Sequence, residues 1–216
     1  MRKTIAILAV LLAGVLVGPA PSASARAKPV STGTTTVAVA GPDTYFELKV
    51  TSTTGKAQLR AGGNTVLATA TGSKTAPFAL KAHVTNRQIG KCGTKTGWTL
   101  NDGKGVSTPL KIRFLCRSQL VNLGWTEGTD SFGASGTLTN YDPATDSWVP
   151  SPNRAVHLQE QKGSSWKSVD NSITDAAGNF SLRASHDWGS FTARLSTPAT
   201  SLDAGTSSAP EPISVG

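Results

Sequence analysis

Short segments in which apolar and polar residues alternate, separated by turn-forming residues, limit the possible folds more than any other feature of this sequence. In residues 45–52 (YFELKVTS) and 78–84 (FALKAHV) the alternation places Lys81 and His83 on the polar side. Successive side chains of an extended strand point to opposite faces, so each segment has one face in a core and one in water. Beyond the N-terminal apolar run, no helix-length segment repeats apolar residues with helical spacing. The sequence therefore predicts an all-β fold of the sandwich type.

The N-terminus has the layout of a secretory signal peptide. Arg2 and Lys3 precede an uncharged apolar run over residues 5–17, and helix breakers lead to Ala23-Ser24-Ala25. The run is shorter than the about 20 residues that a membrane-spanning helix needs. We expect residues 1–25 to be removed by cleavage after Ala25, which leaves a secreted, extracellular chain without a membrane anchor.

The remaining chain divides at a segment without alternation. Residues 26–34 are polar and predict a flexible leader, whereas residues 126–133 (TEGTDSFG) are rich in turn formers. We expect a domain boundary in this second segment. The prediction is two consecutive antiparallel β-sandwich domains, a basic one at residues 35–130 and a second one at residues 131–216.

The chain has two cysteines, Cys92 and Cys116. In an exported protein such a pair indicates a disulfide. A catalytic thiol would need a neighbouring base, but Cys116 ends LKIRFLC on the same strand face as Leu110, Ile112 and Phe114. We expect a disulfide that stabilises the first domain by about 3 kcal/mol on the chain-entropy model.

The second half contains several short elements of a known kind of module. They are SGTLT at 135–139, VHL at 156–158, Trp166 with Val169, the turn from Thr174 to Phe180, and Phe191 with Arg194. Over residues 134–216 the chain resembles bacterial immunoglobulin-like or carboxypeptidase-regulatory-like β-sandwich modules, as found in actinobacterial secreted proteins. The resemblance implies a sandwich fold and an adhesion-like or stalk-like role, and it implies no activity.

The stretch TDAAGNFSL, residues 174–182, has two interpretations. A calcium loop needs several alternating oxygen ligands, but only Asp175 is available, because Ala176 and Ala177 offer none. A hairpin turn needs only the Asp175 side chain and a positive φ at Gly178. The sequence therefore predicts the hairpin and no metal site here.

No motif of catalysis or cofactor binding is found in the chain. His83 and His157 fall on outward strand faces and His186 lies in the turn SHDWG, so we expect all three to be solvated surface residues. The spacing of metal-binding histidines, the nucleophile elbow, the Walker loop and the dinucleotide fingerprint are all missing. We therefore expect a non-enzymatic protein without cofactor or metal. A hydrolase or inhibitor whose site lacks a recognisable motif is the third alternative.

Positive charge is concentrated in the first domain. Residues 26–130 hold fourteen Lys or Arg against five Asp or Glu, whereas residues 131–216 hold five against eight. Lys111, Arg113 and Arg117 fall on the outward side of one strand, so their charges form a stripe.

The stripe predicts binding of an anionic cell-wall polymer or acidic polysaccharide, the polyanions available to an exported bacterial protein. Nucleic acid would need a supporting fold motif that the chain lacks. We expect further cations to extend the stripe, namely Lys81 on another strand and the loop residues Lys91, Lys95 and Lys104. The alternative is a basic face that only keeps the protein in solution.

The runner-up function is that of a carbohydrate-binding module. An exposed tryptophan offers a flat ring on which a pyranose can stack, and Trp148 and Trp188 lie in loops. We expect Trp98 and Trp166 to pack in the two cores instead. Trp125 is a further candidate for stacking on a sugar ring.

Overall fold

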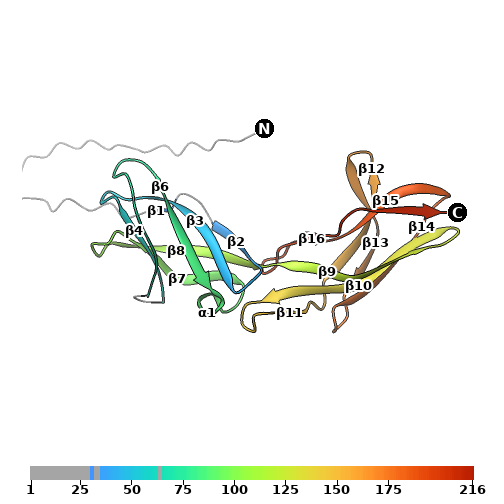
Figure 1. The fold of residues 1–216 in the computed structure, drawn as a ribbon, viewed down its shortest axis with the longest axis horizontal. Helices are drawn as coiled ribbons and strands as arrows, with labels where there is room; N and C mark the ends of the chain where they lie inside the picture. The colour runs from blue at the N-terminus through green and yellow to red at the C-terminus, as the bar shows by residue number, and fades with distance from the viewer. Residues whose placement is uncertain (1–29, 32–34, 63–64) are drawn as a thin grey trace, which may run out of the picture.

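The computed structural model describes residues 30–31, 35–62 and 65–216, and nearly all of its regular structure is β-strand (Figure 1). The predicted all-β class is confirmed. The signal peptide expected at residues 1–25 lies outside the described residues. So does the expected leader at 26–34, except for Val30–Ser31, which pair with a strand of the first unit.

The first unit is a sandwich of a three-stranded and a five-stranded sheet. The order in the smaller sheet is β1-β3-β6, and that in the larger sheet is β2-β8-β7-β4-β5. The elements are β1 (Val30–Ser31), β2 (Thr35–Val39), β3 (Asp43–Thr51), β4 (Lys56–Ala61), β5 (Thr65–Thr71), β6 (Phe78–Thr85), α1 (Asn86–Ile89), β7 (Gly93–Asn101) and β8 (Ser107–Cys116).

The alternation read from the sequence builds the core of this unit. Leu48 of β3 and Leu80 of β6 meet Ile112 and Phe114 of β8 in one buried cluster. Full burial of one such side chain contributes about 1.5–3 kcal/mol, so the two facing sheets are held mainly by these residues. Trp98 is buried in the same cluster, as predicted.

Two features of the first unit bear on the sequence predictions. The disulfide Cys92–Cys116 is present, with its Cα atoms 5.6 Å apart, and this prediction is confirmed. One strand pair differs from the antiparallel arrangement expected from the sequence, because β2 runs parallel to β8. The parallel pair arises because β2 and β8 are far apart in sequence and are not joined by a hairpin.

The second unit is also built of two facing sheets. In one, β10 pairs with β9, β11 and β14, and the other has the order β13-β12-β15-β16, with β17 pairing along β15. The strands are β9 (Ser118–Glu127), β10 (Ser131–Asp142), β11 (Ser147–Pro150), β12 (Ala155–Lys162), β13 (Ser165–Ile173), β14 (Asn179–Ser185), β15 (Gly189–Thr197), β16 (Thr206–Ser207) and β17 (Glu211–Val215).

The change from one sheet system to the other occurs at Arg117. The sequence prediction treated residues 110–125 as the close of the first domain, but β8 ends at Cys116 and β9 then pairs along β10. The segment expected to be a boundary, residues 126–133, contains the end of β9, a tight turn at residues 128–130 and the start of β10. Local alternation does not reveal which partner a strand will choose, and β9 follows β8 after a single residue but pairs in a new sheet.

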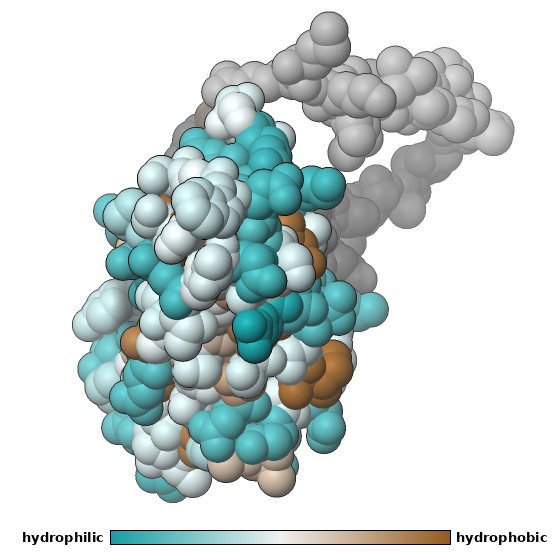
Figure 2. Space-filling model, turned by 90° about the vertical axis from the view of Figure 1, so that its right-hand side faces the viewer, coloured by the Kyte–Doolittle hydropathy of each residue, from teal (hydrophilic) through white to brown (hydrophobic). Residues whose placement is uncertain are grey.

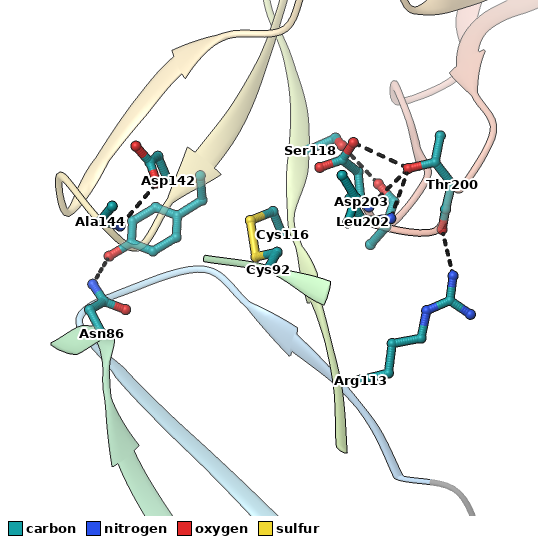
Figure 3. Close-up of a disulfide and its surroundings, with 12 residues drawn as sticks. Asn86, Cys92, Arg113, Cys116, Ser118, Asp142, Ala144, Thr200, Leu202 and Asp203 are labelled. Atoms are coloured by element: carbon teal, nitrogen blue, oxygen red, sulfur yellow. Dashed lines mark hydrogen bonds between the residues drawn. A yellow bond between two sulfur atoms is a disulfide. The ribbon is translucent and has the colours of Figure 1, made fainter. Parts of the chain in front are cut away.

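A loop of the second unit returns to the first unit and joins the two. The loop at residues 198–205 follows β15, and in it the Leu202 carbonyl accepts a hydrogen bond of 2.8 Å from the Cys116 N–H. The Cys116 carbonyl accepts a second bond of 2.8 Å from the Ala204 N–H. Arg113 donates to the carbonyls of Thr200 and Ser201 in the same loop (Figure 3). The joint therefore includes backbone bonds directly at the disulfide.

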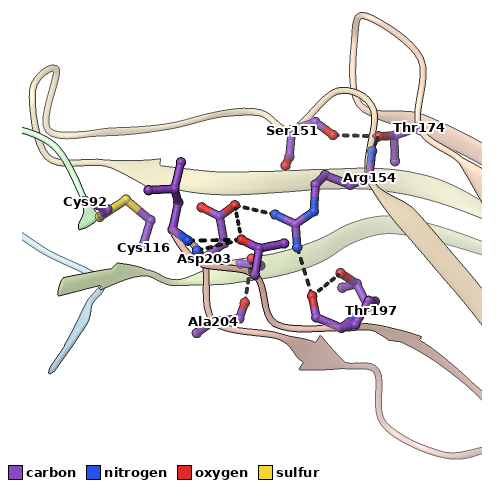
Figure 4. A network of polar contacts seen from close by, with 12 residues as sticks. Cys92, Cys116, Ser151, Arg154, Thr174, Thr197, Asp203 and Ala204 are labelled. Carbon is purple, nitrogen blue, oxygen red and sulfur yellow. Dashed lines mark hydrogen bonds and ion pairs between the residues drawn. A yellow bond between two sulfur atoms is a disulfide. The ribbon is translucent and has the colours of Figure 1, made fainter. Parts of the chain in front are cut away.

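Side chains of the second unit complete this joint. Arg154 forms an ion pair with Asp203, at side-chain exposures of 11% and 16%, and donates to the Pro198 carbonyl (Figure 4). Tyr141 of β10 packs into the core of the first unit, where its hydroxyl accepts a hydrogen bond of 2.7 Å from Asn86. Arg154 therefore fixes the loop within the second unit, whereas the Tyr141–Asn86 bond crosses to the first unit.

The stretch at residues 174–182 forms a turn without a hairpin. The Asp175 carboxylate accepts hydrogen bonds from the N–H groups of Ala177 and Asn179, and Gly178 has a φ of 78°, as the turn prediction required. The hairpin prediction is wrong, because β13 pairs with β12 while β14 pairs with β10. The turn therefore carries the chain from one sheet to the other.

Candidate functional site

The outward face of the five-stranded sheet gathers positive charge. Inward residues of β4 and β8, such as Leu59 and Ile112, lie in the core, so the residues between them point to water. The cations that this alternation places on the outward face are Lys56, Arg60, Lys111 and Arg113, which we name the basic face. The five strands contain no Asp or Glu among their described residues.

Strand register sets the layout of the basic face. Arg60 of β4 pairs with Thr99 of β7, and Thr99 pairs with Pro109 of β8, so β4 and β8 lie two strand spacings apart. This corresponds to about 10 Å across the sheet, and Lys111 and Arg113 are separated by about 7 Å along β8. The charges thus form a flat patch that spans at least three strands.

The cations of the basic face differ in their exposure and in their hydrogen bonds within the protein. Lys56 and Lys111 are exposed. Arg60 donates a 2.8 Å hydrogen bond to Gln58, and Arg113 is half-buried with its guanidinium on the carbonyls of Thr200 and Ser201. The two lysines are therefore the best-placed groups for an external anion.

A hollow of about 340 Å³ lies at one side of the basic face. It is lined by Lys56 and Gln58 of β4, by Thr69 and Thr71 of β5, and by Gly103 of the turn before β8. Hydroxyl, amide and ammonium groups in one shallow hollow can donate hydrogen bonds to anionic oxygens.

The structure joins some of the sequence-predicted cations and separates others. Lys111 and Arg113 are neighbours on β8, and Arg117 is exposed at the corner after it. Lys81 does not extend this stripe, because it is on the outward side of β6 in the opposite sheet of the sandwich. There it borders Tyr45, whose ring stacks at 4.5 Å on His83.

Lys95 also departs from the expectation that it extends the stripe. It belongs to β7 and pairs with the inward residue Ile112, so it lies on the core side of the sheet. Burial lowers the pKa of the Lys95 ammonium. Lys91 and Lys104 lie in exposed positions as expected.

Lys56 and Arg60 were missed by the sequence reasoning. The signal was present, because Ala57 and Leu59 alternate with them and both are fully buried. What the sequence does not show is that β4 and β8 belong to one sheet with β7 between them.

The tryptophans outside the core of the first unit fall into three environments. Trp188 is 76% exposed and Trp148 is 37% exposed, with its ring edge-on to Tyr141 at 5.6 Å. The prediction that Trp166 packs in the second core is wrong: it lies outside the buried cluster, with the Arg194 guanidinium 4.2 Å from its ring centre. Trp125 packs against the edge of that core.

The expectation that His186 is a solvated surface residue is wrong. Its ring stacks on Phe191 with centres 3.9 Å apart, and its Nε2 lies 3.0 Å from Oε1 of Glu160. Lys162 contacts the same carboxylate oxygen. The side chains of Glu160 and His186 are only 6% and 20% exposed, so this is a largely buried ion cluster. By contrast, His83 is half exposed and contacts Asp43.

The two partners shift each other's protonation. Burial alone would lower the pKa of His186, but its hydrogen bonds to the Asp187 carbonyl and to Glu160 outweigh burial and raise it. Burial alone would raise the pKa of Glu160, but Lys162 and His186 outweigh it and lower it. Both ring nitrogens of His186 lie within hydrogen-bond distance of acceptor oxygens, an arrangement that favours the protonated ring. A cationic imidazole with both nitrogens engaged does not serve as a general base for a nearby hydroxyl.

Metal binding has no support in the described part of the chain, where no group of three or more His, Cys, Asp or Glu residues could hold an ion. The same residues contain no helix that is long and apolar enough to cross a membrane.

Comparisons with solved structures find matches at low sequence identity and low TM-score. No protein-family model and no curated protein matches the chain in sequence. Among solved structures, the D00-D0 domain of intimin is 12% identical, with 86% of this chain and 98% of that chain covered at a TM-score of 0.31. The adhesin InvE of Yersinia pseudotuberculosis is 13% identical over 83% of this chain, at a TM-score of 0.30. The chain covers 56% of that InvE chain.

A DUF3823 family protein of Parabacteroides merdae is 14% identical, with 81% of this chain and 100% of that chain covered at a TM-score of 0.33. These low values give no argument about function. The actinobacterial and carboxypeptidase-regulatory-like character expected from the sequence stays a prediction, and the functional argument rests on the residues themselves.

Proposed function

We propose that this is a secreted, non-catalytic β-sandwich protein that binds an anionic polymer outside the cell through its basic face. The observation that carries the proposal is the gathering of Lys56, Arg60, Lys111 and Arg113 on one sheet face whose strands contain no described carboxylate. In this proposal residues 30–116 form the binding unit and residues 118–216 form the second unit.

The shape of the basic face favours a polymer over a small anion. Each exposed charge contributes little by itself, about 0.2–1 kcal/mol, because water and salt screen it. A chain that carries many anionic groups contacts several cations at once, and the separate contacts add up. Anionic wall polymers and acidic polysaccharides have this character.

Two features support a location outside the cell. The N-terminus has the layout of an export signal. The disulfide Cys92–Cys116 suits an oxidising compartment.

The test compares two variants with the same change in net charge. Lys56→Gln with Lys111→Gln removes the two most accessible cations of the basic face, and Lys81→Gln with Arg87→Gln removes two exposed cations outside that sheet. Binding of the mature protein to polygalacturonate is measured by titration at about 50 mM and about 500 mM salt.

We expect the first variant to bind roughly 2- to 30-fold more weakly at low salt and the second to bind nearly as the parent does. High salt should abolish most binding by all three proteins. An equal loss in the two variants would show that total charge, and not the basic face, is responsible.

A further inference from the structure

A polar hollow of about 560 Å³ lies in the second unit, away from the basic face. It is bordered by the turn between β9 and β10, the end of β12, the start of β13 and the loop between β14 and β15. The charged residues that line it are Asp130, Glu160, Lys162, Lys167, His186 and Asp187. With His186 protonated, three cations face three carboxylates, so the formal charges of the lining cancel.

Glu160 is fixed inside this hollow with one oxygen left available. Its Oε1 accepts from both Lys162 and His186. No hydrogen bond engages Oε2 within the described residues, and this atom is not among their sealed, unsatisfied ones. The Glu160 side chain is only 6% exposed, so the surrounding protein fixes the position of Oε2. Such a fixed acceptor is suited to orient a ligand hydroxyl.

An exposed aromatic side chain follows the lining of the hollow directly in sequence. Trp188 follows the lining residue Asp187 directly and is 76% exposed. A carbon added at Gly216 would lie 3.8 Å from this indole, so the ring rests beside the end of β17. Figure 2 shows this end of the molecule: its surface is mostly hydrophilic, with apolar residues in small separate patches. Structural packing does not require such a large exposed ring.

We propose that Trp188 and the hollow form a binding site for an uncharged pyranose oligosaccharide. The apolar face of a sugar ring stacks on the indole. Its hydroxyls both donate and accept, and the hollow offers carboxylate acceptors beside lysine donors. The site is separate from the basic face and would give the protein a second, salt-insensitive ligand.

The test uses cellotetraose and chitotetraose as probes for the whole mature chain. Indole signals are followed by NMR during each titration, for the parent, Trp188→Ala and Asp187→Asn, with Trp148→Ala as the control for loss of an exposed tryptophan. We expect one tetrasaccharide to shift the Trp188 signal and binding to fall about tenfold in Trp188→Ala. Asp187→Asn should weaken binding without unfolding, since Asp187 is exposed.

Two results would overturn the proposal: neither tetrasaccharide binds at millimolar concentration, or Trp148→Ala loses as much affinity as Trp188→Ala. Polygalacturonate binding by Trp188→Ala is measured in parallel. It should match the parent whichever result is obtained, so the sugar site and the basic face succeed or fail independently.

Discussion

Replacing Glu160 with Gln tests the buried ion cluster directly. The change keeps the shape of the side chain and removes the charge that His186 and Lys162 share. A hydrogen bond to a charged partner contributes about 1.5–3 kcal/mol, and the Glu160–His186 pair is buried enough to keep most of this. Lys162 is 55% exposed, so its ion pair is discounted to about 0.2–1 kcal/mol. Because a glutamine still accepts one hydrogen bond, we expect Glu160→Gln to lower the free energy of unfolding by about 1–3 kcal/mol.

The loss should depend on pH in a defined direction. The pKa of His186 is raised above its ordinary 6.5, so the stability it contributes is complete below 6.5 and disappears as the pH rises through the raised value. The pKa of Glu160 is lowered below its ordinary 4.5, so its contribution is complete above 4.5 and disappears as the pH falls through the lowered value. Both contributions are present together between 4.5 and 6.5.

The assay is urea unfolding followed by tryptophan fluorescence at about pH 6 and about pH 9. The difference in unfolding free energy between the parent and Glu160→Gln should shrink at the higher pH, because the contribution of His186 is lost as the pH rises through its raised pKa. Glu211→Gln removes an exposed carboxylate of β17 and provides the control, with little expected effect at either pH. If the parent and Glu160→Gln differ in unfolding free energy by the same amount at both pH values, the reasoning is refuted.

Two further predictions concern the joint and the disulfide. Asp203→Asn leaves the largely buried Arg154 guanidinium without its anion. We expect the free energy of unfolding to fall by about 2–4 kcal/mol and hydrogen exchange at the Cys116 amide to become faster. Unchanged exchange at this amide would contradict a joint that depends on Asp203. Cys92→Ser with Cys116→Ser removes a cross-link between residues 24 apart in sequence. Urea unfolding should show that the free energy of unfolding falls by about 3 kcal/mol, and a fall of less than about 1 kcal/mol would contradict the expected role of the disulfide.

The sequence predicted those parts of the molecule that depend on local patterns. Alternation in β3, β6 and β8 correctly assigned which side chains are buried, and the cysteine pair was correctly read as a disulfide. These predictions succeed because burial of every second residue is a property of one strand.

Partners that are distant in sequence were not predicted. β9 leaves the sheet of β8, and Lys81 lies on the opposite sheet from Lys111, although β6 and β8 have the same local pattern. Likewise His186 stands in a loop whose sequence gives no hint of Glu160, 26 residues earlier. Sheet partnership and loop contacts arise from the packing of the whole chain, which a single segment does not encode.

The loop at residues 198–205 has a mechanical consequence. Tension applied between the ends of the molecule would pass through the backbone at Cys116 and Arg117. At this point the loop runs alongside the chain and forms hydrogen bonds with both the N–H and the carbonyl of Cys116. The connection between the units is therefore a stiff coupling and not a hinge. A ligand of the first unit and a contact at the far end of the second unit would therefore stay at a constant separation and angle.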